Sequence, residues 1–379
     1  MVEDRVYEAL KRPIVGHLDP FFFEIVDEIR ARLRPVFGSA DGATLVISAT
    51  GSGGMETCIA NFVEPGCRFA VLANGYFCDR ITEMARRYGA QVVRLEKPWG
   101  EAIPPDEAAH FIARHQPHIV AFVQAETSTG VYQPGAQFAQ AAHAAGALVL
   151  ADVVTSLGAM PVEADRNGID IAYSCTQKGL SCPPGLSPIF LSRRALEKLH
   201  SRKSAPPSWY FDLRLLEEYY DAPRRYHHTA PISLFYALLE GLRLIETEGL
   251  ESRWMRHRRH HLALVAGLQA MGLELLVAEP HRLWNLITPR VPSGIDDAAV
   301  RRHLLQQHGI DIAGGFGPLA GKIFRIGLMG PLASEHTTLL FLDAFEAALR
   351  SAGFRPNAHA RTAAEQRYET LRESPVPIA

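Results

Sequence analysis

Short apolar segments alternate with amphipathic segments along the first half of this 379-residue chain. The apolar segments are rich in β-branched residues on both faces, which is typical of strands in a sheet that is covered on two sides. We expect strands at 44–50, 68–74, 118–125, 147–152, 170–174 and 187–192, and helices at 79–90 and 134–147. This alternation predicts an α/β fold with a mostly parallel sheet.

The length of the chain exceeds that of one average domain, so we expect a large domain and a smaller one. The large domain is predicted at 1–250 and ends with a long helix within 226–249. A different mixture of strands and helices follows and predicts a small domain at 251–356. Residues 357–379 are polar and proline-bearing, so we expect a peripheral tail.

Composition and charge exclude several classes of protein. The formal net charge of −2 gives no electrostatic reason to expect a nucleic acid or an anionic membrane as a partner. The five cysteines include no CxxC pair and indicate a reducing compartment rather than a disulfide framework. No segment reaches the ~18 uninterrupted apolar residues of a membrane span. We therefore expect a soluble, cytoplasmic protein.

Candidate functional residues follow the predicted strands, where open α/β sheets bind their ligands. The sequence ATGSGGMET follows the first strand and opens a helix, an arrangement that can bind phosphate through free N–H groups. Phe77 follows the second strand, and Asp152 ends a later one. Taken singly, these features also fit an ordinary turn, a core aromatic residue and a helix cap.

Lys178 lies in SCTQKGLSCPPG, between a small polar run and a stiff Cys-Pro-Pro-Gly turn. A lysine that attacks a carbonyl must be held in place and partly desolvated, and such a frame provides both. Asp152 and Lys178 each end their own strand, so they can converge on one ligand. A phosphate-binding turn, an aromatic ring, an acid and a lysine are the four groups that hold pyridoxal phosphate.

The chain resembles the class V, fold-type-I pyridoxal-phosphate aminotransferases, most closely the alanine–glyoxylate and serine–glyoxylate (serine–pyruvate) enzymes, from about residue 16 to Ala348. Its most specific motifs are AETSTGVYQP, the segment from ADVVTSLG to CPPG, YHHTAPISL and GGFGPLAGKIFRIGLMG. The resemblance implies a large domain with a mostly parallel seven-stranded sheet and a smaller C-terminal α+β domain. It also implies that Lys178 is the catalytic Schiff-base lysine and that Asp152 pairs with the pyridine nitrogen.

The resemblance assigns the other site residues as well. Phe77 is expected to stack on the cofactor ring, where the family often has tryptophan. Arg325 in FRIG is expected to bind the substrate α-carboxylate. The other implied cofactor contacts are Thr50, Gly51, Ser52 and Gln177 at the phosphate, Thr127 near the ring hydroxyl, and Tyr226 and Thr229 from the other subunit. The last two make the expected active site a property of a homodimer.

The expected activity is ping-pong transamination with Lys178 as the proton carrier. Because Arg325 is the single visible carboxylate clamp, we expect alanine or serine as donor and glyoxylate or pyruvate as acceptor. Three alternatives stay open. The first is another transaminase of the class, acting on 2-aminoethylphosphonate or on pyridoxamine with pyruvate. The second is a lyase or cysteine desulfurase, and the third is a cofactor-binding protein without turnover.

Two further features bear on these expectations. Family members usually begin with a glycine- and proline-rich segment that helps to close the substrate pocket. This sequence starts at MVEDRVYEAL instead, so we expect either that the true start lies upstream or that one wall of the pocket is missing. His257 and His261 have a zinc-compatible spacing, but no third ligand is evident. We therefore expect no metal site and a solvated helix face at these histidines.

Overall fold

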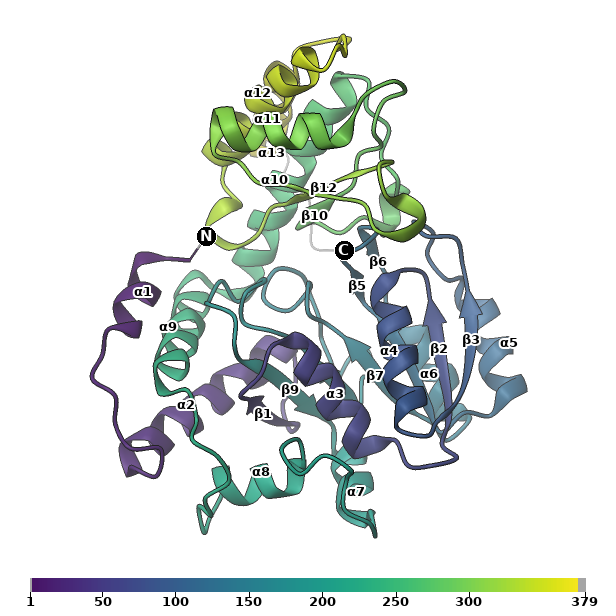
Figure 1. Cartoon of the computed structure of the whole chain (residues 1–379), viewed down its shortest axis with the longest axis vertical. Helices are drawn as coiled ribbons and strands as arrows, with labels where there is room; N and C mark the ends of the chain where they lie inside the picture. The colour runs from purple at the N-terminus through teal and green to yellow at the C-terminus, as the bar shows by residue number, and fades with distance from the viewer. Residues whose placement is uncertain (1, 374–379) are drawn as a thin grey trace.

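The computed structural model describes residues 2–373 and has a seven-stranded sheet at its centre (Figure 1). The strand order is β1-β9-β8-β7-β4-β2-β3. Only β9 runs antiparallel to its neighbours, so the other six strands end at the same edge. The strands are β1 (Ala43–Ile47), β2 (Arg68–Ala73), β3 (Gln91–Glu96), β4 (Ile119–Val123), β7 (Leu148–Asp152), β8 (Ile171–Tyr173) and β9 (Ser187–Leu191). The predicted mostly parallel sheet is confirmed.

Helices cover both faces of this sheet. Right-handed crossovers place α3 and α4 on one face and α5 and α6 on the other. Helices α1, α2 and α9 pack together beside β1 (Figure 1). The helices of this part are α1 (Asp4–Leu10), α2 (Pro20–Phe37), α3 (Gly51–Phe62), α4 (Tyr76–Arg87), α5 (Pro105–His115), α6 (Ala136–Ala144), α7 (Arg193–Ser201), α8 (Leu213–Tyr220) and α9 (Ile232–Glu248).

A smaller α+β unit sits above the carboxyl edge of the sheet in Figure 1. It contains a three-stranded antiparallel sheet in the order β10-β12-β11. Its elements are α10 (Leu250–Ala270), β10 (Leu286–Ile287), α11 (Asp297–His308), β11 (Ala313–Gly314), β12 (Phe324–Gly327), α12 (Glu335–Ser351) and α13 (Ala360–Glu373). Short 3-10 helices η1 (Glu279–His281), η2 (Gly317–Leu319) and η3 (Gly330–Leu332) and the two-stranded ribbon β5 (Ala125–Glu126) and β6 (Val131–Tyr132) complete the described chain.

Two large hydrophobic cores underlie these units. One runs from Val6 to Ile245 and the other from Ala263 to Tyr368. The domain boundary near residue 250 stays a prediction that this arrangement supports. Part of the segment expected to be a peripheral tail forms α13, which packs closely on α10 and buries Ala360, Ala364 and Tyr368. Its apolar residues recur at helical spacing, a pattern that its many charges hide. Residues 374–379 lie outside the described residues.

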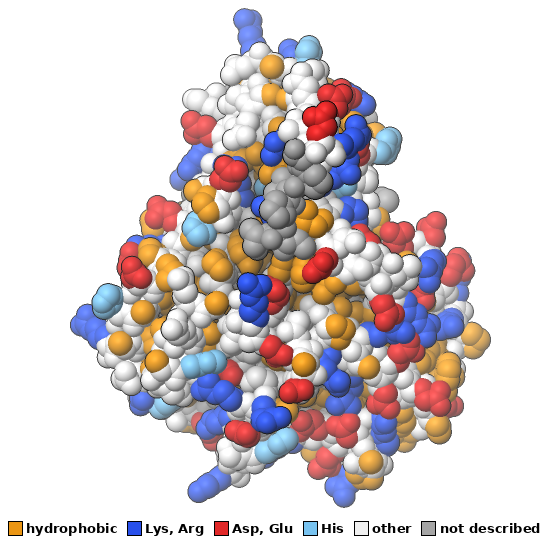
Figure 2. All heavy atoms as spheres, turned by 180° about the vertical axis from the view of Figure 1, so that it is seen from behind, with side chains coloured by type: hydrophobic (Ala, Val, Ile, Leu, Met, Phe, Trp, Pro, Cys, Tyr) orange, Lys and Arg blue, Asp and Glu red, His pale blue; other side chains and the backbone are white. Residues whose placement is uncertain are grey.

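None of the described helices is both long and apolar enough to cross a membrane. On the face shown in Figure 2, acidic and basic side chains are interspersed rather than gathered into one patch. All five cysteines are free and buried.

Candidate active site

A cavity of about 360 Å³ lies at the carboxyl edge of the sheet, below the small unit. It brings together nine of the eleven predicted site residues. They are Thr50, Gly51, Ser52, Phe77, Thr127, Asp152, Gln177, Lys178 and Arg325. Tyr226 and Thr229 do not line it; Tyr226 is 59% exposed, and its hydroxyl lies 3.5 Å from Oγ1 of Thr229. Their expected contribution to a second subunit's site stays a prediction.

Asp152 is the buried acid of this cavity. It ends β7, and its register partner on the adjacent β8 is Tyr173. The Tyr173 hydroxyl donates to Oδ2 at 2.8 Å, and the Val154 N–H donates to Oδ1 at 2.9 Å. Burial raises the pKa of the Asp152 carboxyl to about 6, although these hydrogen bonds and the charge of Arg80 oppose the shift. Because its donors are neutral, this carboxylate is suited to a cationic N–H group in the cavity.

Lys178 lies in the turn between β8 and β9, where the backbone is held tightly. A Cβ at the next residue, Gly179, would come within 2.2 Å of the Leu157 carbonyl oxygen, so no other residue fits this close approach. The lysine is only partly buried and faces the cavity lining that includes Asp152. Its two neighbouring cysteines are buried, and burial raises the pKa of the Cys175 and Cys182 thiols to about 12. Both thiols are therefore protonated and serve as packing groups.

Arg253 of α10 anchors the lysine turn from outside the cavity. Its guanidinium donates to the carbonyl oxygens of Gly158 and Gly179, both at 2.9 Å, and to Oγ of Ser181 at 3.0 Å. The fourth contact is an ion pair with Glu248 at 2.7 Å. Arg253 is buried, so this network fixes the backbone that follows Lys178.

The first turn of α3 forms the end of the cavity expected to bind phosphate. Thr50 precedes the helix, and no side chain of residues 2–373 caps the N–H groups of the first turn. These donors and the helix dipole favour an anion. Arg80 of α4 also lines the cavity, and its Nη1 donates to Oγ of Ser52 at 2.7 Å. Sequence reasoning missed Arg80 because it predicted a helix at 79–90, whereas α4 begins at Tyr76 and places Phe77 and Arg80 one turn apart.

Phe77 is positioned by a second residue that sequence reasoning missed, Glu126. The Phe77 N–H donates to Oε2 of Glu126 at 3.1 Å, and the N–H and hydroxyl of Ser128 donate to Oε1 at 3.0 and 2.6 Å. A Cβ at Gly75 would lie 2.3 Å from Glu126, so glycine permits the carboxyl group to reach the start of α4. Burial raises the pKa of Glu126 to about 7. The only sequence signal for a role of Glu126 was its position in the AETSTG motif.

Arg325 lies on β12 at the side of the cavity formed by the small unit. Its Nε donates to the Gly314 carbonyl oxygen at 2.7 Å, and its Nη1 donates to that of Thr127 at 3.2 Å. The guanidinium carbon stacks 4.0 Å from the centre of the Phe316 ring. Burial lowers the pKa of Arg325, and the charge of Glu126 opposes that effect. The guanidinium is thus fixed in place while Nη2 has no hydrogen-bond partner among the described residues.

The histidines expected on a solvated helix face are buried instead. His257 is completely buried; its Nδ1 contacts the Arg253 carbonyl oxygen at 2.8 Å, and its Nε2 accepts from the Gly330 N–H at 3.1 Å. His261 is 5% exposed. The prediction of a solvated face was wrong because α10 packs against α13, α12 and α9. Within residues 2–373, no group of three or more His, Cys, Asp or Glu is arranged to hold a metal ion.

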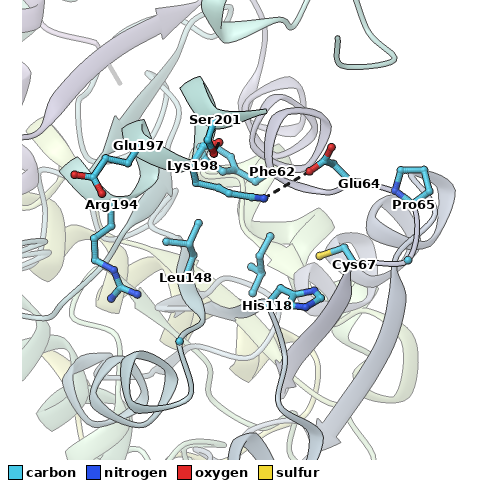
Figure 3. Close-up of a pocket in the computed structure, with 13 residues that line it drawn as sticks. Phe62, Glu64, Pro65, Cys67, His118, Leu148, Arg194, Glu197, Lys198 and Ser201 are labelled. Atoms are coloured by element: carbon cyan, nitrogen blue, oxygen red, sulfur yellow. Dashed lines mark hydrogen bonds and ion pairs between the residues drawn. The ribbon is translucent and has the colours of Figure 1, made fainter. Parts of the chain in front are cut away.

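A larger cavity of about 700 Å³ lies at the opposite edge of the sheet, where β2, β4 and β7 begin (Figure 3). Its lining mixes acidic and basic side chains and includes an ion pair between Lys198 and Glu64 at 3.6 Å. Burial raises the pKa of the Cys67 thiol there, which disfavours the nucleophilic thiolate form. This cavity does not contain the convergent groups found around Lys178.

A mostly parallel sheet with a lysine, a buried acid, an aromatic ring and an uncapped helix at one edge defines a fold-type-I pyridoxal-phosphate enzyme. The Aminotransferase class-V family model matches residues 6–323. The chain belongs to the class-V aminotransferase family, and the predicted resemblance is confirmed.

Several relatives with a named activity are similar to this chain over most of their length. The chain is 38% identical to (S)-ureidoglycine–glyoxylate transaminase of Bacillus subtilis strain 168, over 92% of this chain and 88% of the relative. It is also 38% identical to alanine–glyoxylate aminotransferase of Callithrix jacchus, over 89% and 82% of the two chains. The crystal structure of alanine–glyoxylate aminotransferase from Nostoc sp. has a TM-score of 0.90 and 45% identity, with 92% and 93% coverage.

The family implies pyridoxal phosphate, and the residues of the cavity fit that group. The buried Asp152 carboxyl has only neutral donors, which leaves it suited to a protonated pyridine nitrogen. The uncapped start of α3 is suited to the phosphate, and Phe77 lines the same cavity. Lys178 supplies the amine that the cofactor carbonyl requires.

Proposed function

We propose that this protein is a pyridoxal-phosphate-dependent aminotransferase that transfers an amino group from a small amino acid to glyoxylate, with Lys178 as the catalytic residue. The observation that carries the proposal is the convergence of Lys178, Asp152 and Arg325 on one cavity. When bound, pyridoxal phosphate would supply an electron-accepting ring that stabilises negative charge at the substrate α-carbon.

Each protein group then has a defined task. The Lys178 amine would hold the cofactor carbonyl and would then carry the proton that leaves the α-carbon. Asp152 would keep a proton on the ring nitrogen, because a buried carboxylate whose hydrogen-bond donors are neutral is stabilised by a cation. Phe77, whose N–H is held by Glu126 at the start of α4, would pack on the ring. Arg325 would bind the substrate α-carboxylate through the N–H groups that it does not donate to Gly314 and Thr127.

The number of arginines in the cavity bears on the identity of the amino donor. Among residues 2–373, the cavity is lined by Arg325 from the small unit and by Arg80 from the sheet domain, and Arg80 lies at the end expected to bind phosphate; one arginine thus remains for the substrate, which supports a small donor without a second carboxylate. Alanine and serine meet this condition. (S)-Ureidoglycine also meets it and gains support from the similarity to the Bacillus subtilis transaminase. All five cysteine thiols are buried, so they give no support to a desulfurase, which needs an accessible catalytic cysteine.

The test is a half-reaction on the purified, cofactor-loaded protein. The visible absorbance of the lysine-bound cofactor is followed after mixing with alanine, serine, (S)-ureidoglycine, 2-aminoethylphosphonate or pyridoxamine. Loss of the band with one of the first three, and its return with glyoxylate, supports the proposal and identifies the donor. A band that changes only with 2-aminoethylphosphonate or pyridoxamine, or with no amine, contradicts it.

We further propose that the protein acts as a homodimer in the cytoplasm. Tyr226 and Thr229 lie outside their own cavity, and the exposed Tyr226 ring supports a role in a neighbouring subunit's site. Five buried free thiols support a reducing compartment. Sedimentation at concentrations around the assay concentration tests the dimer; a fully active monomer would contradict it.

A further inference from the structure

The described cavity has three cationic side chains, Arg80, Lys178 and Arg325, and two of them already have a task. Lys178 must react with a carbonyl group, and Arg325 is fixed to Gly314 and Thr127 on the side of the small unit. Arg80 comes from the opposite side, on α4 of the sheet domain. It is therefore the cation whose partner has yet to be identified.

Arg80 forms no direct ion pair with a carboxylate among residues 2–373, and its charge acts on the Asp152 carboxyl only at longer range. Its preceding neighbour, Asp79, forms its ion pair with Arg94 at 2.6 Å instead. Arg80 donates to a neutral oxygen, Oγ of Ser52, at 2.7 Å. Its guanidinium carbon lies 4.9 Å from the centre of the Phe77 ring and 5.4 Å from that of Tyr76. Two aromatic rings thus hold a half-buried guanidinium beside the first turn of α3 without neutralising it.

The two features at this end of the cavity call for the same ligand. The first turn of α3 presents uncapped N–H groups and the positive end of a helix dipole. A phosphate monoester carries close to two negative charges at neutral pH and accepts several hydrogen bonds. A helix start alone offers only about half an elementary charge, so a dianion needs an additional cation here.

We propose that Arg80 binds the phosphate group of the cofactor, together with Ser52 and the N–H groups of the first turn of α3. The guanidinium keeps its contact with Ser52 and turns a second N–H toward a phosphate oxygen, because Arg can donate through five hydrogens in a fixed fork. Its stacking on Phe77 couples the phosphate to the ring that packs on the cofactor. The proposal rests on pyridoxal phosphate being the cofactor.

The test compares two ligands that differ only in the phosphate, pyridoxal phosphate and pyridoxal. Cofactor-free, full-length protein is titrated with each, and the visible absorbance of the lysine-bound form gives Kd. We expect Arg80→Met to weaken pyridoxal phosphate about 10- to 100-fold, which is the range for one charge-assisted hydrogen bond, and to leave pyridoxal within about twofold. Arg80→Lys should recover part of the loss. The 31P resonance of the bound cofactor should shift in Arg80→Met.

The matched control is Arg87→Met on the same helix, because Arg87 pairs with the exposed Glu83 and does not line the cavity. It should change neither Kd. Equal weakening of both ligands by Arg80→Met would show that Arg80 only supports Phe77 or the fold, and an unchanged ratio with an unshifted 31P resonance would also overturn the proposal. A wild-type protein that binds neither ligand at Lys178 would overturn the proposed function itself, which is a distinguishable result.

Discussion

Replacing the buried acid of the active site should stabilise the cofactor-free protein while it abolishes activity. Asp152 is 3% exposed, and burial raises its pKa from the ordinary 3.8 to about 6. The folded protein therefore binds this proton more tightly than the unfolded chain. Stability from this group is fully present below pH 3.8 and is lost as the pH rises toward 6, reaching a loss of about 3 kcal/mol at pH 8.

Asp152→Asn removes this cost but has one acceptor oxygen for two donors. With that oxygen on the Val154 N–H, the amide NH2 faces the buried Tyr173 hydroxyl, which loses its acceptor at a cost of about 1 kcal/mol. The variant should thus be about 2 kcal/mol more stable than the wild type at pH 8. About 1 kcal/mol of that advantage should vanish at pH 5, where the folded carboxyl is mostly protonated. Adding Tyr173→Phe to the variant should recover the cost of the stranded hydroxyl.

Urea unfolding of the two cofactor-free proteins, at equal protein concentration and at pH 5 and pH 8, measures these differences. An Asp152→Asn protein that is no more stable at pH 8, or whose advantage does not change with pH, would refute the reasoning. Such a result would mean that the carboxylate is better solvated or better paired than its neutral hydrogen-bond donors imply.

Three other residues give separate predictions. Arg253→Met should lower the free energy of unfolding by about 3–5 kcal/mol, because three buried acceptors and Glu248 lose their donor. Arg253→Lys should lower it less, and equal losses for the two variants in urea unfolding would contradict this role of the hydrogen bonds. The free energy of unfolding of the wild type should fall as the pH rises from 4.5 to about 7, because burial raises the pKa of Glu126 in the folded protein. Glu126→Gln should reduce this dependence of stability on pH, and an unchanged dependence would contradict the prediction. Arg325→Gln should raise the KM for donor and acceptor by about 100-fold without changing the cofactor absorbance. A changed absorbance or an unchanged KM would show that Arg325 does not bind the substrate.

The sequence sufficed to predict six of the seven strands of the sheet. All six predicted strands are present to within three residues, because each is a continuous apolar run bounded by polar turns. The edge strand β3 was missed because its QVVRLE sequence is only half buried and carries charge. The meeting of Asp152, at the end of β7, and Lys178, in the turn after β8, at one cavity could be predicted because strand ends converge at one edge of a parallel sheet whatever the details of packing.

The residues that position these groups could not be found in the same way. Arg253 reaches the Lys178 turn from a helix of the other unit, and no local pattern links the two segments. The burial of His257 depends on the packing of α10 against other elements, whereas its arginine-rich surroundings predict exposure. Local periodicity describes one element at a time, and these contacts form only when several elements meet.

Identification of the lysine that holds the cofactor is the most direct test of the account. The cofactor-loaded protein is reduced with borohydride, which makes the link between amine and cofactor permanent, and is then digested and mapped by mass spectrometry. The account predicts one labelled site, Lys178, and no label in Lys178→Ala. A label on another lysine, or none on the loaded wild-type protein, would contradict the assignment of this cavity as the active site.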